Sequence, residues 1–198
     1  MQISKDLIRE LRNKTGAGVM DCKQALLEAG GDIQKAQDIL REKGSVVAIK
    51  RSVRDTQEGL VSSYVHSGSK LGVLLEINCE TDFVAKTSEF SRLAKELAMQ
   101  IAAMDPLWIK PEDVPKEVIE KEKEIYKKQA QESGKPEKVI EKIAQGRLEK
   151  YFTEVCLLEQ QYIKDPKFKV KDLITETVAK LGENIRVGRF TRFKVGEE

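Results

Sequence analysis

The apolar residues of the first 44 positions recur every three or four residues, which is the spacing of one face of a helix. Three short runs show this spacing, and each is bounded by a glycine or by a side chain suited to a helix cap. The bounding residues are Ser4, Gly16, Gly30, Gly31, Asp32 and Gly44. We predict a three-helix domain over residues 1–44. Because so short a unit has only a marginal core, we expect it to rest on a partner surface.

Residues 45–57 follow without a clean period and contain Lys50, Arg51 and Arg54. We interpret this segment as a linker or as a loosely held helix. A basic cluster could also contact RNA, so an RNA-binding module is one alternative function. The affinity of such a module would fall steeply with salt.

The pattern changes to that of strands from Gly59 onward. Residues 59–66 and 71–78 are separated by the polar turn Ser67-Gly68-Ser69-Lys70, which together predict a β-hairpin. A second β-rich run covers residues 185–195. Because an isolated hairpin is marginal in water, we place this last strand beside it.

Helical spacing returns between the strands. Apolar residues from Phe90 to Ala102 trace one face of a helix that should pack on the hairpin. Two charged amphipathic helices, over about 115–133 and 137–155, predict a helical hairpin, and a further helix ends at Gly182. The predicted fold class is α+β: a three-helix domain (1–44), a linker (45–57), and a core (58–198) with a small antiparallel sheet packed with helices.

Charge narrows the function classes. The 198 residues include 35 Lys and Arg against 33 Asp and Glu, so the chain is nearly neutral. This balance is not that of a protein that binds polyelectrolytes through its net charge. Residues 1–54 carry 11 basic and 7 acidic side chains, whereas residues 55–105 carry 4 and 8, so electrostatic steering would come from this bipolar front half.

Hydropathy gives no sign of a membrane or secreted protein. The longest apolar run is four residues, against the roughly 18 that a membrane helix needs. Residues 1–12 lack the apolar segment of a signal peptide. We expect a cytoplasmic protein without membrane contact.

Catalytic and metal chemistry find few candidates. Cys22, Cys79 and Cys156 are widely spaced and His66 is the single histidine, which disfavours a zinc site or a disulfide framework. Cys79 with His66 is the conceivable nucleophilic pair, although a buried structural cysteine is the more common case. Glu80 and Asp82 could serve as acid and base, but carboxylates just before a helix more often cap it. We expect no cofactor.

Phosphate-binding loops are also absent from the sequence. Gly16-Ala17-Gly18 lacks the third glycine of a dinucleotide fingerprint, and Gly134-Lys135 is followed by Pro136 instead of Ser or Thr. Nucleotide catalysis by this chain is therefore not expected.

Two apolar positions have unusual locations. Phe83 lies on the short connection between a strand and a long helix, where it could anchor the helix start or project as an exposed wedge, since aromatic side chains are favoured interface anchors. Val19 and Met20 open the second helix after a glycine pair. They could either close the three-helix core or project as an adaptable apolar contact.

Four segments stand out as extended motifs. They are Thr15-Gly16-Ala17-Gly18-Val19-Met20-Asp21-Cys22-Lys23-Gln24-Ala25-Leu26, Gly31-Asp32-Ile33, Asn78-Cys79-Glu80-Thr81-Asp82-Phe83-Val84-Ala85-Lys86 and Gly134-Lys135-Pro136. Together they resemble the bacterial translation elongation factor Ts family over essentially the full length. The resemblance implies a guanine-nucleotide exchange factor for elongation factor Tu without a covalent reaction of its own. It also implies a ubiquitin-associated-like three-helix domain before an α+β core.

The resemblance assigns roles to particular residues. It implies that Arg12, Val19 and Met20 dock on the G domain of the partner. The segment formed by Thr81, Asp82, Phe83 and Val84 is implied to dislodge Mg²⁺, with Phe83 wedging between two partner helices, and His66 resembles a further contact position. No direct nucleic-acid binding is expected.

The chain has one copy of an α/β subdomain that long family members carry twice. In this it is similar to short members that pair as homodimers. A homodimer is therefore a further expectation.

Overall fold

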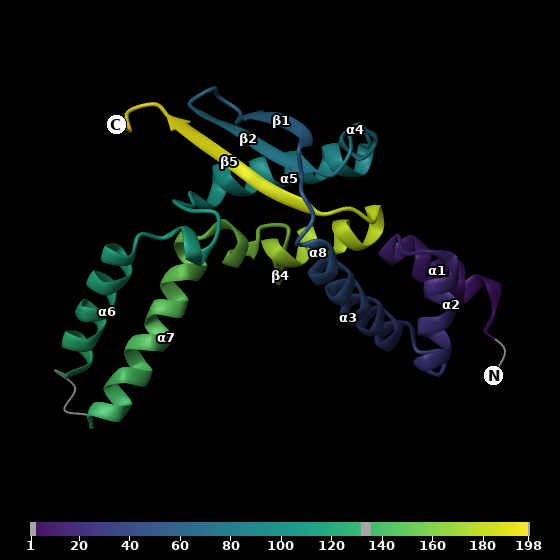
Figure 1. Ribbon diagram of the computed structural model, residues 1–198, viewed down its shortest axis with the longest axis horizontal. Helices are drawn as coiled ribbons and strands as arrows, with labels where there is room; N and C mark the ends of the chain where they lie inside the picture. The colour runs from purple at the N-terminus through teal and green to yellow at the C-terminus, as the bar shows by residue number, and fades with distance from the viewer. Residues whose placement is uncertain (1–2, 132–135, 198) are drawn as a thin grey trace. The chain divides into compact units, whose positions relative to one another are not determined.

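The first N-terminal helix begins and ends where its caps predict, and the third begins at its predicted cap. The computed structural model describes residues 3–131 and 136–197 (Figure 1), and its first helices are α1 (Lys5–Thr15), α2 (Val19–Glu28) and α3 (Ile33–Arg51). The Ser4 hydroxyl accepts a hydrogen bond from the Leu7 N–H (3.2 Å), and the Asp32 carboxylate accepts from the N–H groups of Gln34 (2.8 Å) and Lys35 (3.1 Å). Gly16 ends α1 with φ of 68°, a conformation that glycine adopts freely. These predictions are confirmed.

The apolar faces of α1, α2 and α3 converge on a small core. Its fully buried members are Leu11, Cys22, Ala25, Leu26 and Ala36. Partly buried residues surround them: Ile3, Leu7, Ile8, Ala17, Ala29, Ile33, Ile39 and Leu40. The predicted helical spacing thus describes how the three helices pack.

The prediction that the third helix ends at Gly44 is wrong, because α3 continues to Arg51. Residues 45–51 therefore follow the helical interpretation of this segment. Gly44 is buried, and a Cβ built on it would lie 3.2 Å from the Cβ of Ala179 in α8 (Val170–Leu181). The glycine allows a close helix contact and does not serve as a cap.

The predicted hairpin and its third strand are both present. Strands β1 (Glu58–Val65), β2 (Leu71–Cys79) and β5 (Ile185–Lys194) form one sheet in the order β1-β2-β5, with β2 in the middle (Figure 1). The His66 N–H donates to the Leu71 carbonyl (2.9 Å) across the turn. Alternate residues of β2 are buried, namely Val73, Leu75, Ile77 and Cys79. The α+β class is confirmed.

The helical elements after the hairpin also match. Helix α5 (Ser88–Met104) buries Phe90, Leu93, Ala94, Leu97, Ala98, Ile101 and Ala102. Helices α6 (Lys116–Gln131) and α7 (Glu137–Val155) lie side by side as a helical hairpin (Figure 1). Their connection, with Gly134 and Lys135 of the fourth motif, lies outside the described residues.

Some short elements escaped the sequence pattern. A two-stranded sheet of β3 (Gln161–Tyr162) and β4 (Asp165–Lys169) lies in a segment for which the sequence pattern predicts no strand. A one-turn helix α4 (Asp82–Ala85) follows β2, and 3₁₀ turns occupy Pro111–Asp113 and Leu157–Glu159. All but β4 are too short to generate a period, and the burial of β4 does not alternate.

The chain divides into two compact units. The first comprises residues 1–62, 76–94 and 172–188, and the second comprises residues 63–75, 95–171 and 189–198. The division at residues 44 and 57 stays a prediction.

Leu26→Ala should lower the free energy of unfolding by about 2–5 kcal/mol, because the side chain is fully buried in the three-helix core. The neighbouring Leu27 is 43% exposed, so Leu27→Ala is a matched control that should cost less than about 1 kcal/mol. Urea unfolding followed by circular dichroism measures both. Equal losses for the two variants would contradict the described core.

Candidate functional site: an exposed aromatic on a braced turn

Phe83 projects from the one-turn helix α4. Its side chain is 82% exposed, whereas Phe90, one helix later, is fully buried. The interpretation of Phe83 as a buried anchor of the helix start is therefore wrong, and the exposed alternative is correct. An exposed phenylalanine on a turn between a strand and a long helix presents a large apolar surface that a binding partner can contact.

The turn that carries Phe83 is held from outside by Glu183. The Glu183 Oε2 atom accepts hydrogen bonds from the N–H groups of Glu80 (3.1 Å) and Thr81 (3.0 Å), and its Oε1 atom accepts from the Thr81 hydroxyl (2.6 Å). One carboxylate oxygen thus satisfies two backbone N–H groups directly after β2, and the other accepts from the Thr81 side chain. Hydrogen bonds to a charged acceptor are the stronger kind.

In a second set of hydrogen bonds, the carboxylate of Glu80 is the acceptor. Glu80 Oε1 accepts from the Asn184 N–H (2.7 Å), and its Oε2 accepts from Arg54 (3.2 Å). The Asn184 side chain is buried and donates to the carbonyls of Arg54 (2.7 Å) and Ser52 (3.4 Å). The Asn184 N–H and the Arg54 guanidinium lower the pKa of Glu80. We call the residues Ser52, Arg54, Glu80, Thr81, Glu183 and Asn184 the bracket.

The predicted capping role of the acidic residues is wrong in detail. The N-cap of α4 is Thr81, whose hydroxyl accepts from the Val84 N–H at 3.5 Å, and Glu80 faces the bracket instead. Asp82 lies in the first turn and pairs with Lys86 (2.6 Å). This ammonium lowers the pKa of Asp82. Both carboxylates thus accept hydrogen bonds as anions, which does not suit a general acid.

Cys79 lacks the environment of a nucleophile. It is fully buried and its thiol donates to the Thr81 carbonyl (3.1 Å). Burial and the nearby Glu183 charge raise the pKa of the thiol to about 11, the opposite of an activated cysteine. His66 is exposed in the hairpin turn, where a ring nitrogen shares a hydrogen bond with the Tyr64 hydroxyl (2.9 Å). The geometry gives no support to a thiol enzyme.

The N-terminal candidates are all at the surface. Val19 and Met20 begin α2 directly after its N-cap Gly18, and they are 48% and 72% exposed. They therefore project, and the interpretation that they close the core is wrong. Arg12 is exposed near the end of α1.

The basic cluster at the end of α3 is partly neutralised. Lys50 and Arg51 lie in its last turn, whereas Arg54 pairs with Glu80 at 3.2 Å. Apolar residues share this end of the helix: Val46, Ile49 and Val53 are 51%, 71% and 84% exposed. This mixed surface does not favour the RNA-binding alternative.

The chain matches the family described as Elongation factor TS over residues 1–197. A protein named Elongation factor Ts from Thermotoga petrophila is 61% identical over 197 residues, covering 100% of this chain and 98% of the relative. The namesake from Caldanaerobacter subterraneus is 60% identical over 195 residues, covering 98% of each chain. That from Carboxydothermus hydrogenoformans is 58% identical, covering 98% of this chain and 90% of the relative.

The chain belongs to the elongation factor Ts family. The resemblance carried by the Thr15–Leu26 and Asn78–Lys86 motifs is thereby confirmed. The two motifs differ in how the structure uses them. In this family member the first supplies the α1–α2 junction, and the second supplies the end of β2, the turn and α4.

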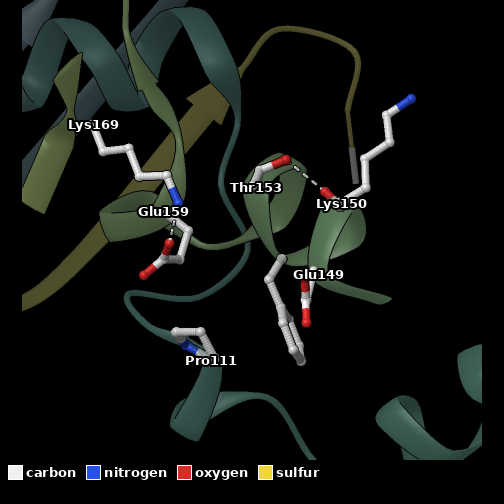
Figure 2. Close-up of a pocket in the computed structure, with 7 residues that line it drawn as sticks. Pro111, Glu149, Lys150, Thr153, Glu159 and Lys169 are labelled. Atoms are coloured by element: carbon white, nitrogen blue, oxygen red, sulfur yellow. Dashed lines mark hydrogen bonds and ion pairs between the residues drawn. The ribbon is translucent and has the colours of Figure 1, made fainter. Parts of the chain in front are cut away.

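Outside the exposed turn, this family member has a shallow hollow at the base of its helical hairpin (Figure 2). It is lined by Pro111, Glu149, Lys150, Phe152, Thr153, Glu159 and Lys169. Glu159 receives hydrogen bonds from Lys169 (2.7 Å) and Lys171 (2.8 Å), and the Thr153 hydroxyl donates to the Lys150 carbonyl (2.7 Å). These polar groups form hydrogen bonds with protein groups, which is not the arrangement of a phosphate or metal site.

The described residues contain neither a metal site nor a membrane-spanning helix. Over residues 3–131 and 136–197, three or more His, Cys, Asp or Glu side chains are nowhere grouped so that they could hold a metal ion. Over the same residues, each helix is too short or too polar to cross a membrane.

All three cysteines of this family member should be unreactive in the folded state, because each is buried and free. With a pKa of about 11, only about one Cys79 thiol in a thousand is ionised at about pH 8. A thiol-disulfide reagent should label the protein only after denaturation, which is followed by mass spectrometry with a denatured sample as control. Labelling of Cys79 within seconds in the native protein would contradict this description.

Proposed function

We propose that this member of the elongation factor Ts family is a guanine-nucleotide exchange factor for elongation factor Tu in the cytoplasm. It binds the GDP complex, dislodges Mg²⁺ and promotes the exchange of GDP for GTP. The observation that carries the proposal is the 82% exposure of Phe83 on a turn held by the bracket. At this exposure most of the ring surface is available to a partner, and aromatic side chains are favoured interface anchors.

Exchange needs no covalent step. The factor binds the nucleotide-free GTPase more tightly than the nucleotide-bound GTPase, and by linkage the nucleotide weakens the binding of the factor by the same ratio. The factor therefore speeds exchange in both directions. The intracellular supply of GTP over GDP sets the outcome, and the factor itself requires no selectivity.

The Thr81–Val84 segment acts on the bound nucleotide. Phe83 enters between two helices of the GTPase, which displaces the side chains that hold Mg²⁺. Mg²⁺ is the strongest local positive charge on the phosphates, so its loss weakens nucleotide binding greatly. Asp82 stays paired with Lys86, which limits the repulsion of a carboxylate brought near phosphate.

Phe83 does not supply the acceleration alone. A ~10⁴-fold faster release corresponds to a barrier lowered by ~5.5 kcal/mol, whereas truncating an interface aromatic commonly costs ~2–4 kcal/mol. The N-terminal helices supply a second contact: Arg12, Val19 and Met20 dock on the G domain. Two linked contacts raise the effective concentration of Phe83 at its site.

Phe83→Ala should slow stimulated GDP release more than about tenfold with the fold unchanged, because it removes the apolar surface that enters the GTPase. Stopped-flow fluorescence with labelled GDP on elongation factor Tu measures the release. Val53→Ala is the matched control, since Val53 is also an apolar residue in the first unit and is 84% exposed. Near-normal release with Phe83→Ala, at saturating factor, would count against the exchange mechanism.

We also propose that a second copy of the chain covers the outer face of the sheet in the second unit. Val65, Leu74, Phe193 and Val195 are 64%, 48%, 68% and 72% exposed there. They come from β1, β2, the end of β5 and the residue that follows β5. Two such faces could pack as a sandwich with twofold symmetry, the common arrangement of homodimers.

Phe193→Glu should convert the dimer into a monomer, because a carboxylate would be buried at the interface without a partner. Sedimentation velocity at increasing concentration measures the association state. Phe83→Glu places the same charge on the other exposed phenylalanine and should leave the dimer intact. A wild-type protein that sediments as a monomer throughout, or a Phe193→Glu variant that remains dimeric, would refute this interface.

A further inference from the structure

Glu183, which is partly exposed, holds the backbone that presents Phe83. Its carboxylate accepts the N–H groups of Glu80 and Thr81 and the Thr81 hydroxyl. We propose that Glu183 is a positioning residue for nucleotide exchange, which fixes the orientation in which the Thr81–Val84 turn offers Phe83 to the GTPase. This inference rests on the proposed function.

The carboxylate is itself held in place from both sides along the chain. Helix α8 ends at Leu181, and Gly182 follows with φ of +75°, its N–H donating to the Val178 carbonyl (2.8 Å). On the other side, Asn184 is buried and bonded to the carbonyls of Ser52 and Arg54. Glu183 therefore starts from a fixed backbone, as a positioning group must.

The turn needs such a support because α4 is only four residues long. So short a helix has no stability of its own, and its cap bond from the Val84 N–H to the Thr81 hydroxyl is long at 3.5 Å. The same hydroxyl donates to Glu183 at 2.6 Å. Glu183 thus orients the oxygen that caps α4, and it fixes the preceding two N–H groups.

Phe83 cannot position itself. With 82% of its side chain in water, it has little packing to select its direction, so that direction is inherited from the backbone of α4. A preordered backbone reduces the entropy lost when the ring enters a partner. Loss of Glu183 should therefore slow the step that Phe83 performs, while docking through Arg12, Val19 and Met20 persists.

The experiment compares Glu183→Ala and Glu183→Gln with wild type in stopped-flow release of labelled GDP from elongation factor Tu. Removing charge-assisted hydrogen bonds of this kind should lower the limiting rate at saturating factor about tenfold. The half-saturating concentration should change less than about threefold, because docking is retained. Glu183→Gln, which keeps one acceptor oxygen, should fall between, and it carries the test if Glu183→Ala does not fold.

Glu89→Gln is the matched control. Glu89 is also a carboxylate of the first unit, but its partners are Lys180 at 3.3 Å and Ser88 at 2.9 Å. The Glu89→Gln variant should stimulate GDP release from elongation factor Tu at the wild-type rate. Amide hydrogen exchange in the free protein should show faster exchange at Glu80 and Thr81 in the Glu183 variants and not in Glu89→Gln.

A double-mutant cycle with Phe83→Ala separates positioning from general stability. If Glu183 acts through Phe83, Glu183→Ala should slow release less than about twofold further in the Phe83→Ala background. Full additivity, or a normal limiting rate for Glu183→Ala beside a slow Phe83→Ala, would overturn the positioning role and leave the proposed function intact. A normal rate for Phe83→Ala itself would overturn the proposed function, and this inference with it.

Discussion

Strand β2 ends at Cys79, and the N–H groups of Glu80 and Thr81 donate hydrogen bonds to the carboxylate of Glu183. Glu183 lies two residues after the last residue of α8. Buried or half-buried backbone groups must find partners, and here the partner comes from a segment about a hundred residues away. The reciprocal bond from the Asn184 N–H to Glu80 closes the arrangement. The chain can therefore place a large apolar ring in water without leaving its backbone free to move.

The bracket separates two demands that conflict in most interfaces. A side chain that enters a partner must be exposed, and an exposed side chain has few packing contacts to fix its direction. In the proposed function, the hydrogen-bonded polar groups of Glu80, Thr81 and Glu183 hold the backbone, and the exposed Phe83 supplies the contact. Val19 and Met20 are likewise exposed at the start of α2. Their helix is held in the core by the buried residues Cys22, Ala25 and Leu26.

Local patterns predicted the parts of the fold that local forces determine. The caps at Ser4 and Asp32, the hairpin and α5 follow from spacing and turn chemistry, and the motif around Phe83 drew attention to the site. The extension of α3 past Gly44 did not follow, because this glycine allows a close contact with Ala179 of another helix and does not act as a cap. The sequence pattern did not predict β3 and β4 either. Beside them the buried Gln100 amide donates hydrogen bonds to the Gln160 side chain and to the Gln161 carbonyl. Glu183 lies 102 residues from Thr81, and such a hydrogen bond leaves no period in a sequence.

We propose that the ring of residue 83 enters elongation factor Tu when nucleotide leaves. A photoreactive benzoylphenylalanine at this position would detect the contact, with the same group at Val53 as control. We expect a crosslink to elongation factor Tu from position 83 in the nucleotide-free complex, and its loss when GDP and Mg²⁺ are added in excess. A complex that forms normally but yields no crosslink from position 83, or a crosslink that GDP does not affect, would show that the ring does not enter the GTPase in this way.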